Sequence, residues 1–235
     1  MVIDIDTVPQ AKPRYARVGD VLGRYRLEAL LGEGAVGSVF RAQHVDLGRK
    51  VAVKVVSPEL HDRTDILRRF FNEARAVNRI RHDNIVDITD IHDDHAEQPY
   101  LVMELLEGQP LSRAIREQAP MPPDKAVAII DQMCDALGAV HAVDIVHRDL
   151  KTDNVFLVGD PDTPQVKLLD FGVSKFLAAD EAALTRPGEL MGTPQIMAPE
   201  QIRGGDVDHR IDVYAVGITL FELLTGTHPL ETTDL

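Results

Sequence analysis

The chain has 235 residues, of which 44% are hydrophobic and 27% charged, a composition that suits one large globular domain or two small lobes. Its formal net charge of -13 argues against nucleic acid as a partner, because neutralising phosphates requires a basic face. A single cysteine, Cys134, excludes an intramolecular disulfide and fits a reducing compartment. We expect no membrane segment within this chain, because no apolar run is long enough to span a bilayer.

The first half of the chain predicts a polar tail followed by a small β-rich lobe. Residues 1–19 are polar and contain prolines, which indicates a tail or an arm. From residue 25 to residue 56, β-branched runs alternate with glycine turns, which predicts a meander of antiparallel strands. Apolar residues at helical spacing predict a helix over 66–81, and two further strands are expected at 85–91 and 100–105.

The second half is predicted to be mainly helical. Helices are expected over 111–118, 125–143 and 211–225, with short strands at 155–158 and 166–169. The buried face of the 125–143 helix is predicted to consist of Val127, Ile130, Cys134, Leu137 and Val140. Cys134 is therefore expected to be a small core residue.

Four motifs follow one another in a fixed order. The glycine-rich run is Gly32-Glu33-Gly34-Ala35-Val36-Gly37, and the lysine of Val51-Ala52-Val53-Lys54 comes after it. The run His147-Arg148-Asp149-Leu150-Lys151-Thr152-Asp153-Asn154 is followed by Asp170-Phe171-Gly172. A glycine-rich loop alone matches many unrelated folds. Together and in this order, the motifs resemble the eukaryotic-type (Hanks-type) serine/threonine protein kinases, of the kind also found in bacteria.

This resemblance implies an α+β, protein kinase-like fold with two lobes. After the tail at 1–22, a small lobe with an antiparallel sheet and one helix would occupy 23–106, and a mainly helical large lobe would occupy 107–235. The large lobe would be partial, because the helices that ordinarily follow the Asp212 helix are missing from the chain. We therefore expect a fragment of a longer protein. Asp212 itself would brace the backbone of the catalytic loop.

The implied activity is transfer of the γ-phosphate of Mg-ATP to serine and threonine hydroxyls of proteins, in signal transduction. Asp149 would act as the base or orient the hydroxyl, and Lys151 would steady the γ-phosphate. Lys54 would hold the α- and β-phosphates and pair with Glu73. The metal, Mg²⁺ or Mn²⁺ in its place, would be held by Asn154 and Asp170, which carry the hard oxygen ligands that magnesium prefers.

The same resemblance assigns the residues that would bind ATP. Met103 would be the gatekeeper beside the adenine, and Glu104 and Leu106 would offer backbone groups that read the base. Three glycines would let backbone amides approach the phosphates, namely Gly32, Gly34 and Gly37. The residues expected to sandwich the adenine are Leu31, Val39, Ala52 and Phe156.

The run from Gly192 to Glu200 resembles the end of a kinase activation segment, which docks protein substrates. Ser174, Thr185 and Thr193 are candidate sites of autophosphorylation, with Thr185 as our choice, and self-association for trans-autophosphorylation is implied as well. We expect a cytoplasmic domain, while the resemblance leaves open a membrane anchor further along the parent protein.

Less specific interpretations of the same residues remain. Lys54 would also be explained by a side chain that reaches solvent from a half-exposed strand, and Glu73 by a solvated helix face. The alternatives to an active kinase are a pseudokinase-type nucleotide-binding scaffold and an inactive fragment of a longer receptor-like kinase.

Overall fold

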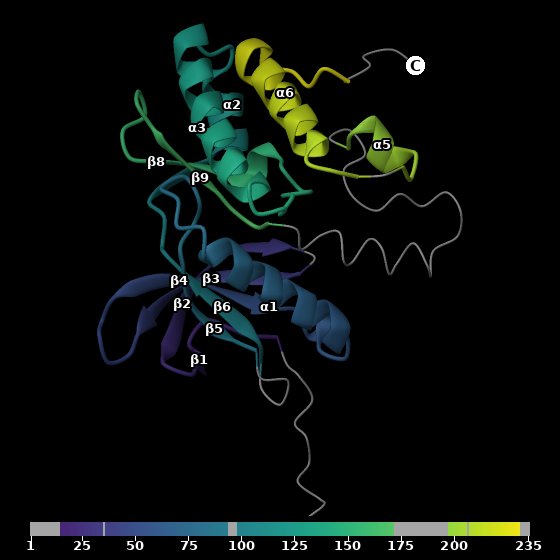
Figure 1. Cartoon of the computed structure of the whole chain (residues 1–235). Helices are drawn as coiled ribbons and strands as arrows, with labels where there is room; N and C mark the ends of the chain where they lie inside the picture. Colours follow the sequence, from purple (N-terminus) through teal and green to yellow (C-terminus); the bar gives the residue numbers. More distant parts are fainter. Residues whose placement is uncertain (1–14, 35, 94–97, 172–196, 206, 231–235) are drawn as a thin grey trace, which may run out of the picture. The chain divides into compact units, whose positions relative to one another are not determined.

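The structure is a computed structural model that describes residues 15–34, 36–93, 98–171, 197–205 and 207–230 (Figure 1). The chain divides into two compact units. The first contains the residues up to Arg68 together with Thr89–Leu105, and the second contains Arg69–Ile88 together with the residues from Leu106 onward.

The first unit is built on a six-stranded sheet with the strand order β1-β2-β3-β4-β6-β5. Its strands are β1 (Val21–Leu22), β2 (Tyr25–Gly34), β3 (Gly37–His44), β4 (Lys50–Val56), β5 (Ile88–His92) and β6 (Tyr100–Met103). A 3₁₀ turn at Pro58–Leu60 precedes helix α1 (Thr64–Asn78), within which the boundary between the two units falls after Arg68. The predicted antiparallel meander over residues 25–56 is confirmed, since β2, β3 and β4 pair antiparallel in sequence order.

Side-chain alternation along β4 places the core valines of this sheet on one face and Lys54 on the other. Val51, Val53 and Val55 belong to a buried cluster that also contains Tyr25 and Phe40. Because successive side chains of a strand point to opposite faces, Ala52 and Lys54 lie on the other face of the sheet. The valines thereby position Lys54 through the strand register.

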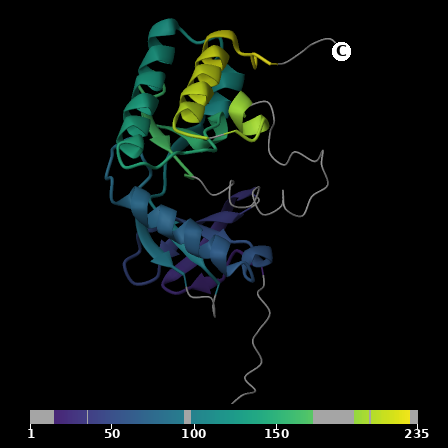
Figure 2. The same ribbon diagram turned by 45° about the vertical axis from the view of Figure 1, so that its right-hand side comes forward.

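The second unit combines helices with a three-stranded sheet of order β7-β8-β9. Its elements are β7 (Gly108–Pro110), α2 (Leu111–Gln118), α3 (Pro123–His141), a 3₁₀ turn at Thr152–Asn154, β8 (Val155–Val158), β9 (Gln165–Leu168), α5 (Pro199–Ile202) and α6 (Arg210–Thr225). Figures 1 and 2 show α6 running alongside α3. Among the described residues, no helix has the length and apolar character to cross a membrane.

The boundaries of these helices follow from local signals. Proline begins α3 at a position where its missing N–H is not needed. Gly226 ends α6 with a φ of 78°, and its N–H donates to the carbonyl oxygen of Glu222. The prediction of a helix over 111–118 is confirmed to the residue.

The predicted buried face of α3 was partly wrong. Leu137 and Val140 are buried as expected, but Cys134 is exposed and Val127 is 60% exposed. The buried residues are instead Ala126, Ile129, Met133, Ala136, Leu137 and Val140. Two apolar series at helical spacing coexist in this helix, and contacts with α6 and β9 select the one that contains Met133.

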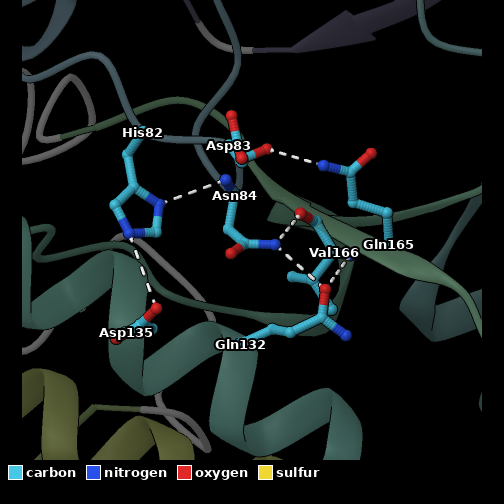
Figure 3. Close-up of polar contacts among 7 residues, drawn as sticks. All are labelled: His82, Asp83, Asn84, Gln132, Asp135, Gln165 and Val166. Carbon is cyan, nitrogen blue, oxygen red and sulfur yellow. Dashed lines mark hydrogen bonds and ion pairs between the residues drawn. The ribbon is translucent and has the colours of Figure 1, made fainter.

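The strand predicted at 85–91 begins later, because the preceding loop is held by side chains of other elements. Asn84 Nδ2 donates to Gln132 Oε1 on α3 at 3.0 Å and to the Val166 carbonyl oxygen on β9 at 2.9 Å (Figure 3). Gln165 Nε2 donates to the carbonyl oxygen of Asp83 at 3.1 Å. Ile85 consequently forms an isolated bridge with Leu168, and regular β5 pairing starts at Ile88.

Candidate active site

Two predicted catalytic residues and one predicted metal ligand meet in the loop between α3 and β8. Lys151 Nζ lies 3.2 Å from Asp149 Oδ2. Asn154 Nδ2 donates to the same carboxylate oxygen at 3.1 Å and to the Asp149 carbonyl oxygen at 2.8 Å. The 3₁₀ turn at Thr152–Asn154 folds the chain back, so that residue 154 reaches residue 149. A carboxylate, an ammonium and an amide therefore share one small region.

Asp212, at the start of α6, holds the backbone of this loop. Its carboxylate is 1% exposed and accepts the N–H of His147 at 2.8 Å and the N–H of Arg148 at 3.0 Å. The expected bracing role thus has a direct geometric basis. A third donor was missed by sequence reasoning: His141 Nε2, at the end of α3, lies 2.7 Å from Asp212 Oδ2. The only sequence signal was a histidine in the last turn of a helix.

Two residues beside the site have unusual backbone conformations. Arg148 has a φ of 66° and Asp170 a φ of 50°, a region that L-residues rarely occupy. Each such residue costs on the order of 1–3 kcal/mol and persists only when the surroundings over-determine it. At Arg148 the bond to Asp212 supplies part of that constraint. Beside Asp170, the Leu169 N–H donates to the Asn154 carbonyl oxygen at 2.9 Å.

His147 connects the loop to the segment that carries Asp170. The imidazole is fully buried, its Nε2 lies 3.0 Å from the Leu169 carbonyl oxygen, and its ring lies 4.5 Å from the ring of Phe171. Burial lowers the pKa of His147 below its ordinary 6.5, although the charges of Asp212 and Asp149 oppose the shift. The neutral imidazole therefore donates from Nε2 to the carbonyl oxygen of Leu169.

The donor set suits a hard cation. Asn154 turns its amide nitrogen toward Asp149, which leaves the amide oxygen as a candidate ligand. The backbone bond from Leu169 brings the chain just before Asp170 to Asn154. One amide oxygen and one carboxylate are a donor set that magnesium accepts, with water and substrate phosphates as the remaining ligands. Asn154 and Asp170 would thus hold Mg²⁺.

The glycine-rich run forms the hairpin between β2 and β3. The last residue pair of the hairpin is Gly34 with Gly37. A Cβ on Gly37 would lie 1.9 Å from the carbonyl oxygen of Val55 in β4, so no side chain fits there. Gly32 and Gly34 carry no such restriction, since a Cβ on Gly32 would meet nothing within 4 Å. This hairpin therefore has room for a ligand beside Gly32, whereas at Gly37 it packs closely on the backbone of β4.

Other predicted ATP-binding residues of the first unit lie opposite one another on neighbouring strands of the sheet. Val39 pairs with Lys54, and Ala52 pairs with Met103, the last residue of β6. Lys54 is 6% exposed and Ala52 is 7% exposed, whereas Leu31 is 53% exposed. Lys54 is thus a buried ammonium, a state that requires compensating charge.

The remaining predicted residues occupy several elements. Glu73 lies half-buried on α1, Phe156 lies half-buried on β8, and Glu104 and Leu106 lie in the segment between β6 and β7. The pairing of Lys54 with Glu73 and the sandwich around adenine stay predictions. The candidate phosphorylation sites Ser174, Thr185 and Thr193 lie outside the described residues.

Comparison with known proteins decides the family. Residues 25–235 match the protein kinase domain. The chain belongs to the protein kinase family. Within this family it resembles bacterial serine/threonine-protein kinases. It is 47% identical to serine/threonine-protein kinase Pkn1 of Myxococcus xanthus over 213 residues, which cover 90% of this chain and 30% of Pkn1. It is 40% identical to PknL of Mycobacterium tuberculosis over 206 residues, which cover 88% of this chain and 50% of PknL.

Solved structures confirm the kinase fold. The kinase domain of Mycobacterium tuberculosis PknI superimposes with a TM-score of 0.71 at 27% identity, covering 94% of this chain and 82% of that domain. The predicted α+β kinase fold is thereby confirmed. The chain therefore spans about a third of the length of Pkn1 and half of the length of PknL.

Proposed function

We propose that this kinase domain transfers the γ-phosphate of Mg-ATP to serine and threonine hydroxyls of proteins. The observation that carries the proposal is the catalytic loop, in which Asp149, Lys151 and Asn154 contact one another and Asp212 holds the backbone just before Asp149. Phosphoryl transfer depends on positioning and electrostatic stabilisation more than on covalent chemistry by the protein. A loop braced by a buried carboxylate supplies such positioning.

Each residue has a distinct task in this proposal. Asp149 orients the attacking hydroxyl and accepts its proton, and Lys151 neutralises charge on the phosphoryl group in transit. Asn154 and Asp170 hold the metal, which, when bound, neutralises the charge that develops on the phosphate oxygens. Lys54 holds the α- and β-phosphates, with Glu73 as its counter-charge. The names of the relatives Pkn1 and PknL, both serine/threonine-protein kinases, support this assignment.

The test is an assay with labelled ATP, Mg²⁺ and a generic basic protein as acceptor. We expect transfer to serine and threonine, and a loss of about 10²-fold or more in Asp149→Asn and in Asp170→Asn. Asn tolerates the left-handed backbone of residue 170, so the fold should persist in that variant. Asp131→Asn, which removes the same charge from an exposed position on α3, serves as the matched control. Full activity in Asp149→Asn would sink the assignment.

A nucleotide-binding scaffold is the alternative that the same assay tests. Its signature would be saturable ATP binding to the wild-type protein without transfer to any acceptor. The presence of Lys54, Asp149 and Asp170 together favours the active enzyme, because a scaffold has no need for all three.

We further propose that autophosphorylation takes place in trans between two copies, in a cytoplasmic setting that suits the single cysteine. A rate of autophosphorylation per molecule that rises with protein concentration would support the trans reaction. A rate that is independent of concentration would contradict it.

We also propose that residues 1–22 form a tail, whose last two residues pair with β2 as strand β1, that residues 23–106 form the small lobe and that residues 107–235 form part of the large lobe. On α6, Val213 is 61% exposed, Phe221 42% and Leu224 38%, and these residues share one helix face. An apolar face of this kind ordinarily packs against further structure. A version extended at its C-terminus should therefore melt at a higher temperature, and equal melting temperatures would count against a partial lobe.

A further inference from the structure

Among the contacts between the described part of the arm before the first strand and the first unit, one joins two side chains through a carboxylate. Tyr15 donates its hydroxyl hydrogen to Oε1 of Glu59, in the 3₁₀ turn after β4, and Ser57 donates to Oε2 of the same side chain. The hydrogen bonds from Ser57 and then Tyr15 lower the pKa of Glu59, so the bridge contains an ionised carboxylate at neutral pH. Tyr15 lies outside residues 25–235, the region that matches the protein kinase domain. The bridge is therefore a feature of this chain's own arm.

Ser57 also holds the tip of the glycine-rich hairpin. Its backbone N–H donates to the carbonyl oxygen of Val36, in the turn between β2 and β3, at 2.8 Å. One residue further along the hairpin, Gly37 packs so closely on Val55 that a Cβ has no room. The hairpin tip is thus fastened to the end of β4 at the residue whose side chain Glu59 binds.

A cavity lies where the arm, the hairpin and the end of β4 meet. It has a volume of about 300 Å³, and its lining includes Tyr15, Glu33, Ser38, Val55, Glu59 and Gln98. On this side a polar chain runs from Tyr15 through Glu59 and Ser57 to Val36 and connects the arm to the hairpin tip.

We propose that Tyr15 and Glu59 are positioning residues for the glycine-rich hairpin, so that the N-terminal arm sets how tightly the domain binds the phosphates of ATP. The inference rests on the proposed function, because it assumes that the hairpin covers those phosphates. Neither residue touches the nucleotide; each acts through Ser57 and the carbonyl oxygen of Val36. Ordering the hairpin before binding reduces the entropy lost on binding.

The test compares Tyr15→Phe, Glu59→Ala and the double variant. Each single change should raise the KM for ATP by about three- to tenfold, the range of one hydrogen bond, and leave kcat unchanged. The double variant should add little, because both changes break the same bridge. Amide hydrogen exchange of residues 32–39, measured without ATP, should accelerate in all three variants.

Tyr25→Phe is the matched control. Tyr25 donates its hydroxyl hydrogen to Asp90 Oδ2 at 3.2 Å within the same sheet, and its removal should leave the KM for ATP and exchange in the hairpin unchanged. Unchanged KM and exchange in Tyr15→Phe and Glu59→Ala would overturn the inference, as would equal effects in Tyr25→Phe. Failure of the proposed function would look different, because the wild-type protein itself would then not turn over ATP.

Discussion

Replacing Asp212 with asparagine tests whether its carboxylate holds the backbone of the catalytic loop in place. The carboxylate receives three donors: His141 and His147 at Oδ2, and Arg148 at Oδ1. Asparagine is isosteric but has only one acceptor atom at this position. In its best orientation the amide oxygen keeps the two donors at the Oδ2 site, and its NH₂ group then faces the N–H of Arg148.

The expected cost follows from this geometry. Hydrogen bonds to charged groups contribute about 1.5–3 kcal/mol each. The substitution removes one such bond, places two donors against each other and weakens the two remaining bonds to neutral strength. We therefore expect the free energy of unfolding to fall by about 3 kcal/mol or more, since a buried donor is also left unpaired. Loss of the Arg148 bond releases the strained backbone next to Asp149, and a displacement of 1 Å there would lower kcat by about 10²-fold.

Urea unfolding and steady-state kinetics measure the two effects. The urea midpoint of Asp212→Asn should fall with an unchanged m-value, and kcat should fall more than the KM for ATP rises. Asp208→Asn makes the same chemical change at a half-exposed position, where the aspartate is bonded to Arg210, and should alter neither quantity appreciably. If Asp212→Asn unfolds and turns over like the wild-type protein, the carboxylate does not brace the loop.

Three further expectations concern separate features. His147 has a folded-state pKa below 6.5, so the unfolded chain takes up a proton first as the pH falls through 6.5. The free energy of unfolding should then fall by at most about 1.4 kcal/mol per pH unit. In urea unfolding between pH 5.5 and 7.5, the free energy of unfolding of His147→Phe should depend less steeply on pH than that of the wild-type protein. Asn84→Ala removes one buried and one partly buried hydrogen bond and should lower the free energy of unfolding by about 2–3 kcal/mol, whereas the exposed neighbour variant Asp83→Ala should be neutral. Equal urea midpoints for the two variants would contradict the network in Figure 3. Chelation by EDTA should abolish phosphate transfer, excess Mg²⁺ should restore it and Mn²⁺ should substitute, while activity that persists in EDTA would exclude Asn154 and Asp170 as essential metal ligands.

The arrangement of the catalytic loop could be predicted from the sequence because its contacts join residues that are close together in the chain. Asp149, Lys151 and Asn154 lie within six residues, so one turn is enough to bring them together. The same holds for α2, whose limits follow from a proline before it and the helical spacing of its apolar residues. Family resemblance supplied the roles of these residues, and local chemistry made their proximity expected.

Contacts across long sequence separations were decided by the tertiary structure. Which apolar series α3 buries depends on its neighbours, so Cys134 ended on the surface although its sequence pattern allowed the core. Asp212 meets His141 across 71 positions, and Asn84 meets Val166 across 82, because packing of helices and strands closes those distances. No periodicity encodes such pairs: side-chain spacing specifies a face of an element, and only packing selects the partner that the face meets.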